Sequence, residues 1–215
     1  MTQLDLSPAE LDAFEAEFAA PMSISPEVQD LLFRDAHTAN AFSPEPVSEE
    51  QMRAVYELIK WGPTAMNAQP MRIVLVRTPE AHDRLVQHMA EGNKAKTAAA
   101  PLVAVLAADV DFHDEFYKTF PAYPGARDAF ADEAPRTVTA TLNTSLQIGY
   151  FIIGLRAAGL AAGPMAGFDA AAVSQEFFPD GRHQALLVVN IGQATAESFR
   201  PRQPRLEYAD VVTTV

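Results

Sequence analysis

Hydrophobic positions along the chain switch repeatedly between helical and strand-like spacing. Behind Ser48 and Gln51, which match a capping box, apolar residues recur every three or four positions and predict an amphipathic helix. Short apolar, β-branched runs predict three strands, at 71–77, 102–107 and 185–191. Capping residues and apolar spacing predict further helices that begin near 26 and 79 and that span 112–120 and 169–177. This mixture predicts an α+β or α/β sandwich in which helices cover a sheet, although spacing does not give the strand order.

The longest apolar segment, 138–168, has the hydrophobicity of a buried helix rather than of a membrane span. Asn143, Gln147 and Arg156 interrupt it, so no clean run reaches the ~20 residues that a bilayer requires. We expect a helix over about 135–159, ending at a C′ glycine. Because this helix is apolar nearly all round, we expect it at the centre of a domain or a dimer.

Length and charge fit one soluble domain. With 215 residues the chain can bury a sizeable core, and we expect a helical extension at 1–25 followed by a main domain at 26–215. The net charge of −12 argues against nucleic-acid binding, and the absence of cysteine excludes disulfides, thiolate metal sites and a cysteine nucleophile. The N-terminus lacks the basic and apolar regions of a secretion signal, so we expect a cytoplasmic protein that is not a membrane protein.

Catalysis by side chains alone has little support in the sequence. No GxGxxG follows a strand, and neither a phosphate-binding loop motif nor a GxSxG elbow is present. The five histidines lack metal-ligand spacing, so we predict no metal site, and nearly all carboxylates fall on polar faces. A cofactor that brings its own chemistry therefore fits better.

The segment from Trp61 to Pro70 is the most informative candidate for a binding loop. Its prolines and glycine prevent the preceding helix and the following strand from continuing through it. Thr64, Asn67 and Gln69 place uncharged hydrogen-bonding groups on this stiff frame, which suits a planar polar ligand. From spacing alone, an ordinary helix-to-strand connection is the alternative.

The pattern P-[ST]-x-x-N-x-Q-P at 63–70 resembles the loop of the nitroreductase family of flavin enzymes. The wider run around it resembles one branch of that family, the malonic semialdehyde reductases of bacterial pyrimidine degradation. Three further segments match the family in order along the chain, at 35–42, 92–97 and 163–169. Together the matches span about residues 30–210.

The resemblance implies a nitroreductase-like α+β sandwich with a central, mostly antiparallel sheet, in a homodimer that exchanges C-terminal tails. It implies bound FMN, NADH or NADPH as reductant, and ping-pong reduction of malonic semialdehyde to 3-hydroxypropionate. Two alternatives are a nitro or quinone reductase of broad range and a flavin-binding protein without physiological turnover. Neither the reductant preference nor the physiological substrate follows from the sequence.

The resemblance also implies roles for individual residues. His37, Thr38 and Asn40 would bind phosphate and ribityl, and Asn93 and Lys96 would be the catalytic residues at the ring edge. The other positions that it assigns to cofactor binding are Pro63, Thr64, Ala65, Asn67, Pro164, Met165, Ala166 and Gly167.

Two departures from the family pattern change the expected site. The family's usual arginine is absent from the 35–42 segment, so a tail arginine, Arg202 or Arg205, is expected to meet the phosphate. Ala166 stands where nitroreductases often have an acidic residue, which suggests a different substrate. Without the resemblance, His37 would be read as a helix cap and Lys96 as a surface lysine.

Overall fold

The computed structural model describes residues 22–215 and divides the chain into two compact units, Met1–Ala36 and His37–Val215. In the first unit, helix α2 (Pro26–Gln29) begins at the predicted proline and continues as a π-helix, η1 (Asp30–Arg34). The expected extension at 1–25 lies almost wholly outside the described residues, so that domain boundary stays a prediction.

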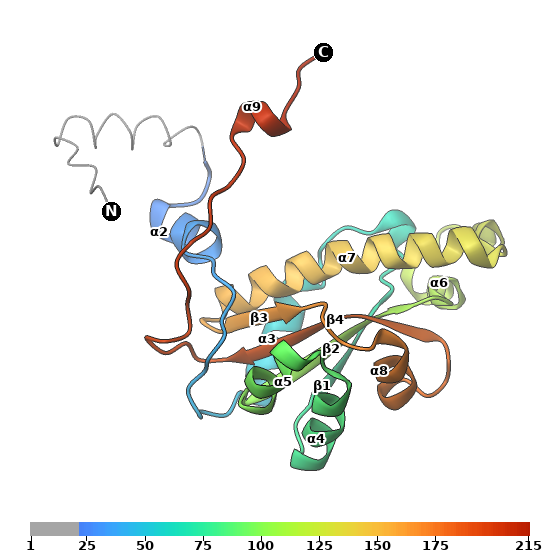
Figure 1. Ribbon diagram of the computed structural model, residues 1–215. Helices are drawn as coiled ribbons and strands as arrows, with labels where there is room; N and C mark the ends of the chain where they lie inside the picture. Colours follow the sequence, from blue (N-terminus) through green and yellow to red (C-terminus); the bar gives the residue numbers. More distant parts are fainter. Residues whose placement is uncertain (1–21) are drawn as a thin grey trace. The chain divides into compact units, whose positions relative to one another are not determined.

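A four-stranded antiparallel sheet forms the centre of the second unit (Figure 1). Its strands are β1 (Met71–Val76), β2 (Leu102–Asp109), β3 (Ala161–Met165) and β4 (His183–Gly192). They lie in the order β1-β2-β4-β3, and every neighbouring pair is antiparallel. The predicted fold class and the three predicted strands are confirmed, whereas β3 was not predicted as a strand.

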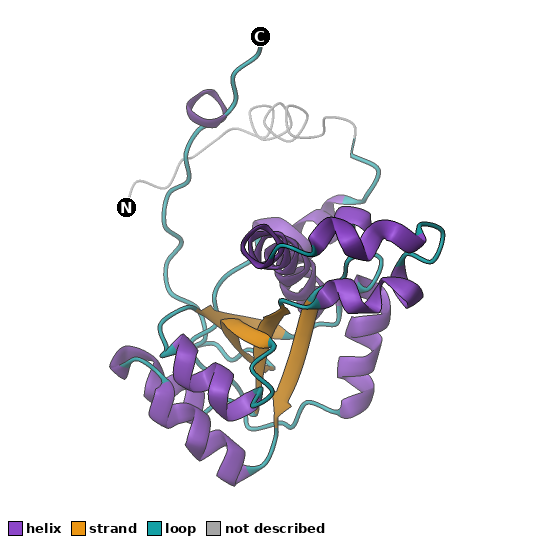
Figure 2. Ribbon diagram, turned by 90° about the vertical axis from the view of Figure 1, so that its right-hand side faces the viewer, coloured by secondary structure: helices purple, strands orange, loops and turns teal. Residues whose placement is uncertain are grey.

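Helices cover both faces of the sheet (Figure 2). Residues of α3 (Glu49–Ile59) and α7 (Glu133–Ala157) share one apolar cluster with β2 residues Leu102, Ala104 and Leu106. On the other face, the neighbouring β2 side chains pack with residues of α4 (Pro79–His88) and α8 (Ala170–Phe177). The remaining elements are α5 (Glu91–Ala98), η2 (Ala65–Asn67), η3 (Phe112–Glu115), α6 (Phe116–Thr119), η4 (Pro124–Phe130) and α9 (Tyr208–Val211).

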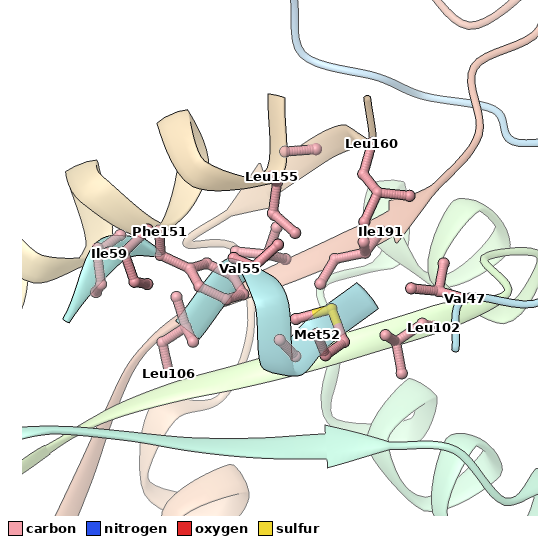
Figure 3. Close-up of a cluster of buried hydrophobic side chains, with 14 residues drawn as sticks. Val47, Met52, Val55, Ile59, Leu102, Leu106, Phe151, Leu155, Leu160 and Ile191 are labelled. Carbon is pink, nitrogen blue, oxygen red and sulfur yellow. The ribbon is translucent and has the colours of Figure 1, made fainter. Parts of the chain in front are cut away.

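The core between the sheet and the α3–α7 pair is continuous (Figure 3). Val55, Leu106 and Phe151 are at most 1% exposed there, and each such buried side chain stabilises the fold by ~1.5–3 kcal/mol. The predicted capping box is present, because the Ser48 hydroxyl accepts from the Gln51 backbone and the Gln51 side chain accepts from the Ser48 backbone. The predicted C′ glycine is also present, since Gly159 has φ +73°.

Helix α7 forms where the sequence predicts it, but one chain buries only part of its surface, so its expected place at the centre of a dimer stays a prediction. It is long and apolar enough to cross a membrane by length and composition, but 39% of its most apolar window is buried within the protein. Within one chain, it packs one face on α3 and the sheet. The other face exposes a stripe of five apolar residues, the α7 stripe: Val138, Leu142, Leu146, Tyr150 and Ile153.

Candidate functional site

Three of the segments expected to bind a cofactor meet along the β3 edge of the sheet. The backbone N–H of Ala39 donates to the carbonyl of Ala162 at 2.9 Å. The side-chain amide of Asn93 donates to the carbonyl of Gly167 at 2.9 Å. Residues 37–40, 93–96 and 163–167 therefore lie together, and we call them the cradle.

Glycine is required for this close packing. A Cβ atom on Gly163 would lie 2.5 Å from the carbonyl oxygen of Ala39, and one on Gly167 would lie 2.6 Å from the Asn93 amide nitrogen. Real Cβ atoms essentially never come so close to another heavy atom, so a side chain at Gly163 would push β3 away from the Ala39 backbone, whereas one at Gly167 would displace the Asn93 amide from its bond to the Gly167 carbonyl. Gly163 is thus what allows β3 to form against residues 37–40.

Lys96 brings an unpaired cation to the cradle. Its side chain is partly buried, and among residues 22–215 its ammonium has no ion-pair partner, whereas nearby Lys94 pairs with Glu91 at 3.0 Å. Its backbone carbonyl accepts from the amide of Asn190 at 3.1 Å. Asn190 is fully buried, and its Oδ1 has no partner within the described part of the chain. No motif in the sequence pointed to Asn190.

The start of the C-terminal tail joins the cradle through His37. A guanidinium nitrogen of Arg202 lies 3.3 Å from His37 Nδ1, and the Phe199 ring lies 5.4 Å from the imidazole. Because a guanidinium can only donate, His37 Nδ1 is the acceptor in this bond. Arg205 instead donates to the carbonyls of Gln203 and Pro204 and is exposed. Within one chain, Arg202 is therefore the tail arginine beside the predicted phosphate-binding segment.

The 63–70 loop lies elsewhere, at the opposite edge of the sheet. It leads directly into β1, and two strands separate β1 from β3. At about 4.8 Å per strand spacing, the two edges lie roughly 14 Å apart. One chain thus does not bring Pro63, Thr64, Ala65 and Asn67 to the cradle.

Two amides of α7 hold this loop in place. Asn143 Oδ1 accepts from the backbone of Ala65 at 2.7 Å, and Gln147 Oε1 accepts from the backbone of Met71 at 2.9 Å. In the sequence these residues only interrupted an apolar run. Two amides four residues apart in an apolar helix share one face, and that spacing was the signal that could have identified them.

The loop backbone is strained. Met66, Asn67 and Gln69 have φ values of 50°, 53° and 45°, in the left-handed region that costs a non-glycine residue ~1–2 kcal/mol. Such strain persists where the surroundings over-determine the backbone, and it concentrates at functional sites. The surrounding structure therefore holds the backbone of this loop in a fixed conformation, which an ordinary helix-to-strand connection does not require.

A cluster of arginines and aspartates lies next to the loop and was missed in the sequence. Asp109 is 1% exposed and accepts from Arg72 at 2.7 Å and from Arg182 at 2.6 Å. Its hydrogen bond raises the pKa of Arg182 above the ordinary value, although burial acts in the opposite direction. Asp109 is an exception to the expectation that nearly all carboxylates fall on polar faces, and it ties β1 and β2 to the residue that precedes β4.

Comparison with known proteins decides the family. A sequence profile described as the nitroreductase family matches residues 34–193. The chain belongs to the nitroreductase family. A relative from Streptomyces coelicolor, named provisionally as an NADH dehydrogenase/NAD(P)H nitroreductase, is 58% identical over 193 residues, 89% of this chain and 98% of that protein. A relative from Leptothrix cholodnii with the same name is 48% identical over 178 residues, 82% of this chain and 90% of that protein.

Solved structures of nitroreductases share the fold. One from Bacillus subtilis superposes with a TM-score of 0.77 at 22% identity and covers 94% of this chain and 100% of its own. One from Exiguobacterium sibiricum, in complex with FMN, has a TM-score of 0.78 at 16% identity and covers 90% of this chain and 99% of its own. The predicted nitroreductase family is confirmed, and the malonic semialdehyde branch stays a prediction.

Proposed function

We propose that this nitroreductase-family chain is an FMN-dependent NAD(P)H oxidoreductase that works as a homodimer with cofactor sites shared between subunits. One observation carries the proposal: the predicted cofactor residues are divided between the two edges of one sheet. The cradle contacts one edge and the 63–67 loop precedes the strand at the other. A second copy of the chain can supply the loop that the cradle lacks.

The α7 stripe supports a dimer of this kind. Its members are spaced by three or four residues, lie on one side of the helix and are 37–68% exposed. Exposed apolar surfaces of this kind mark protein contacts. Asn143 and Gln147, which hold the loop, lie on the same helix as the stripe. A partner packed on α7 would therefore lie beside residues 63–67.

The cradle fits FMN by the chemistry of its donors. Arg202 and His37 suit a phosphate, the partly buried Lys96 ammonium suits a ring edge that gains negative charge, and the small residues 163–167 let a planar group approach backbone. When bound, FMN supplies hydride-transfer chemistry between NAD(P)H and a second substrate. Asn93 positions the 163–167 segment by its bond to Gly167, and Lys96 would hold a positive charge beside the ring edge of the bound group.

The proposed second substrate is malonic semialdehyde, with nitro and quinone compounds as the alternative class. Purified protein should be yellow, and cofactor released by heat should run as FMN on chromatography. NADH and NADPH oxidation should then be measured with malonic semialdehyde and with nitrofurazone. FAD, or no flavin after reconstitution, would contradict the proposal. Weak, non-saturating NADH oxidation at full FMN occupancy would instead support a flavin-binding protein without turnover.

Mixed dimers test whether the site is shared. Lys96→Ala should inactivate the cradle, and Asn67→Ala should inactivate the loop. In a mixed dimer, one site combines both changes and the other combines neither. Equal mixing during refolding should therefore restore about a quarter of wild-type activity, because half of the dimers are mixed and each contains one intact site. No recovery on mixing, with both variants folded, would show that the two regions act within one chain.

A further inference from the structure

Asn190 places an amide in the buried centre of the sheet. It is the only polar residue between Ala185 and Ile191, and it is fully buried. Side chains alternate along a strand, so Asn190 faces the same side of the sheet as Val188, which packs with residues of α4 and α8. A buried amide on an apolar face is unfavourable unless its hydrogen bonds are made. The bonds of Asn190 therefore decide what it contributes at this position.

One end of this amide is bonded and the other is not. Nδ2 donates to the backbone carbonyl of Lys96 at 3.1 Å, whereas Oδ1 has no partner among residues 22–215. Because a carbonyl oxygen can only accept, the nitrogen must face Lys96, and this fixes the orientation of the amide. An apolar residue of similar shape would leave no orphan oxygen, so folding stability alone does not explain an amide here.

The bond from Asn190 caps the C-terminal end of α5. The last four carbonyls of a helix lack intrahelical partners and must be satisfied in another way. In α5, the carbonyls of Ala95 and Thr97 accept from backbone N–H groups that follow the helix. The carbonyl of Lys96 lies between these two and accepts from the Asn190 side chain. Asn190 therefore completes the last turn of the helix that carries Lys96.

Polar bonds contribute much of what holds α5 in place. Within α5, all of whose residues are described, Thr97 alone is buried, and its hydroxyl donates to the sulfur of Met165 at 3.9 Å. Nearer the start of the helix, the amide of Asn93 donates to the carbonyl of Gly167. Because this helix buries so little apolar surface, the position of its last turn depends on the bond from Asn190.

Asn190 also adjoins a second segment of the cradle. It lies opposite Gly163 in the pairing of β3 with β4, and its Cβ is 3.4 Å from the position of a Cβ on Gly163. That same position lies 2.5 Å from the carbonyl oxygen of Ala39. Asn190 thus lies beside the point where residues 37–40 pack on β3, while its amide holds the turn that contains Lys96.

We propose that Asn190 is a positioning residue that, by capping α5, fixes where the Lys96 side chain enters the cradle and where its ammonium lies. This inference rests on the proposed function for the role of Lys96, but not for the cap itself. A misplacement of about 1 Å in such a site can cost roughly 100-fold in rate. Asn190 has no exposed surface, so it acts through Lys96 and not on a ligand.

Hydrogen exchange of residues 91–100 tests the cap. Asn190→Leu removes the donor but keeps a side chain of similar shape, and exchange there should become faster by roughly fivefold or more. Asn190→Ala carries the same test if the leucine variant does not fold. Thr144→Val on α7 is the matched control, because Thr144 is also fully buried and its hydroxyl has no partner in the described part of the chain. Unchanged exchange in a folded Asn190 variant, or equally fast exchange in Thr144→Val, would overturn the proposal.

The reduction potential of bound FMN tests the link to Lys96. Lys96→Ala should weaken binding of reduced relative to oxidised FMN by about tenfold or more, which lowers a two-electron potential by about 30 mV per tenfold change. Asn190→Leu should give a severalfold weakening in the same direction, and Thr144→Val should give none. If Asn190 acts through Lys96, the double variant should match Lys96→Ala alone.

Two results for the potential would contradict this link. A merely structural role would leave the potential unchanged in Asn190→Leu. An Asn190→Leu effect that persists in full beside Lys96→Ala would mean that Asn190 acts independently of that lysine. Either result, or an equal shift in Thr144→Val, would overturn the proposal.

These measurements separate the positioning residue from the proposed function. If the purified chain bound no flavin, the proposed oxidoreductase would fail, whereas faster exchange confined to residues 91–100 would still support Asn190 as the cap of the Lys96 turn. If FMN and NADH oxidation were present but Asn190→Leu changed neither the exchange nor the potential, the proposal for Asn190 alone would fail.

Discussion

The two edges of the sheet are built in opposite ways. Strand β3 is buried at every residue except Pro164, because residues 37–40 pack directly on it. Strand β1 is only partly buried at five of its six residues, and it begins from the strained loop. The chain thus completes its β3 edge with its own backbone and leaves the β1 edge open. An open edge strand is a surface on which another chain can pair.

The C-terminal tail has the composition that could pair there. Residues 199–215 are exposed throughout, and the last five, Val211 to Val215, are all β-branched. The exchanged tail expected from the family resemblance stays a prediction, and a partner's tail on β1 would explain why this edge is left uncovered. The following changes test the contrast between the two edges, from the largest expected effect to the smallest.

The largest loss of folding stability should follow from a change in the ion cluster beside the β1 edge. Asp109→Ala leaves Arg72 and Arg182 without their buried carboxylate, and breaking a buried pair costs ~3–5 kcal/mol. Because both arginines are partly exposed, we expect the lower end, about 3 kcal/mol, by urea unfolding. Glu176→Ala, which breaks the exposed pair with Arg84, should cost less than ~1 kcal/mol. Similar losses in both variants would show that the cluster does not anchor this edge.

The difference between the two sheet edges also explains which elements could be predicted from the sequence. The helix that begins after Ser48 and the helix 169–177 were predictable because capping and apolar spacing agree there. Strand β3 was not, because Ala161–Met165 contains small residues and a proline, and it becomes a strand only through its pairing with β4. The separation of the loop from the cradle depends on strand order, which periodicity does not encode.

At the β3 edge, Lys96→Ala should slow reduction of the bound flavin by NADH more than it weakens FMN binding. An unpaired ammonium matters most when negative charge develops beside it. Loss of one such donor costs ~2–4 kcal/mol of barrier, a slowing of roughly 30- to 1,000-fold in stopped-flow measurements. Lys94→Ala is the matched control, since that lysine already pairs with Glu91. A wild-type rate in Lys96→Ala would remove Lys96 from the proposed mechanism.

Arg202→Ala should lower FMN affinity more than Arg205→Ala. Arg202 lies against His37 in the cradle, whereas within residues 22–215 Arg205 bonds only to its neighbouring tail carbonyls. A charge-assisted hydrogen bond contributes roughly 1.5–3 kcal/mol, or about tenfold or more in affinity. FMN fluorescence quenching measures both variants. A larger loss in Arg205→Ala would mean that the phosphate is held by a tail that crosses from the partner subunit.

Gly163→Ala tests the close packing that completes the β3 edge. The added methyl would meet the Ala39 carbonyl at 2.5 Å, and overpacking of this kind costs ~1–3 kcal/mol. Gly92→Ala on α5 is the control, because nothing lies within 4 Å of its Cβ position. That helical substitution should stabilise the fold by up to ~1 kcal/mol. Urea unfolding distinguishes the two, and equal stability would show that residues 37–40 move freely away from β3.

The smallest expected change in folding stability is at Asn67, and it measures the backbone strain of the loop at the β1 edge. Asn67→Ala and Asn67→Gly both lose the bond to Thr119, so their difference isolates the backbone at φ 53°. The left-handed backbone conformation is sterically unfavourable for alanine but not for glycine. Asn67→Gly should therefore be more stable than Asn67→Ala by about 1 kcal/mol. At Ala95, an exposed helical position of α5, the order should reverse, with Ala95→Gly costing ~1 kcal/mol. If glycine destabilised both positions alike, the loop would relax to an ordinary backbone in solution, and the presentation of residues 63–67 to a partner's cradle would lose its rigid support.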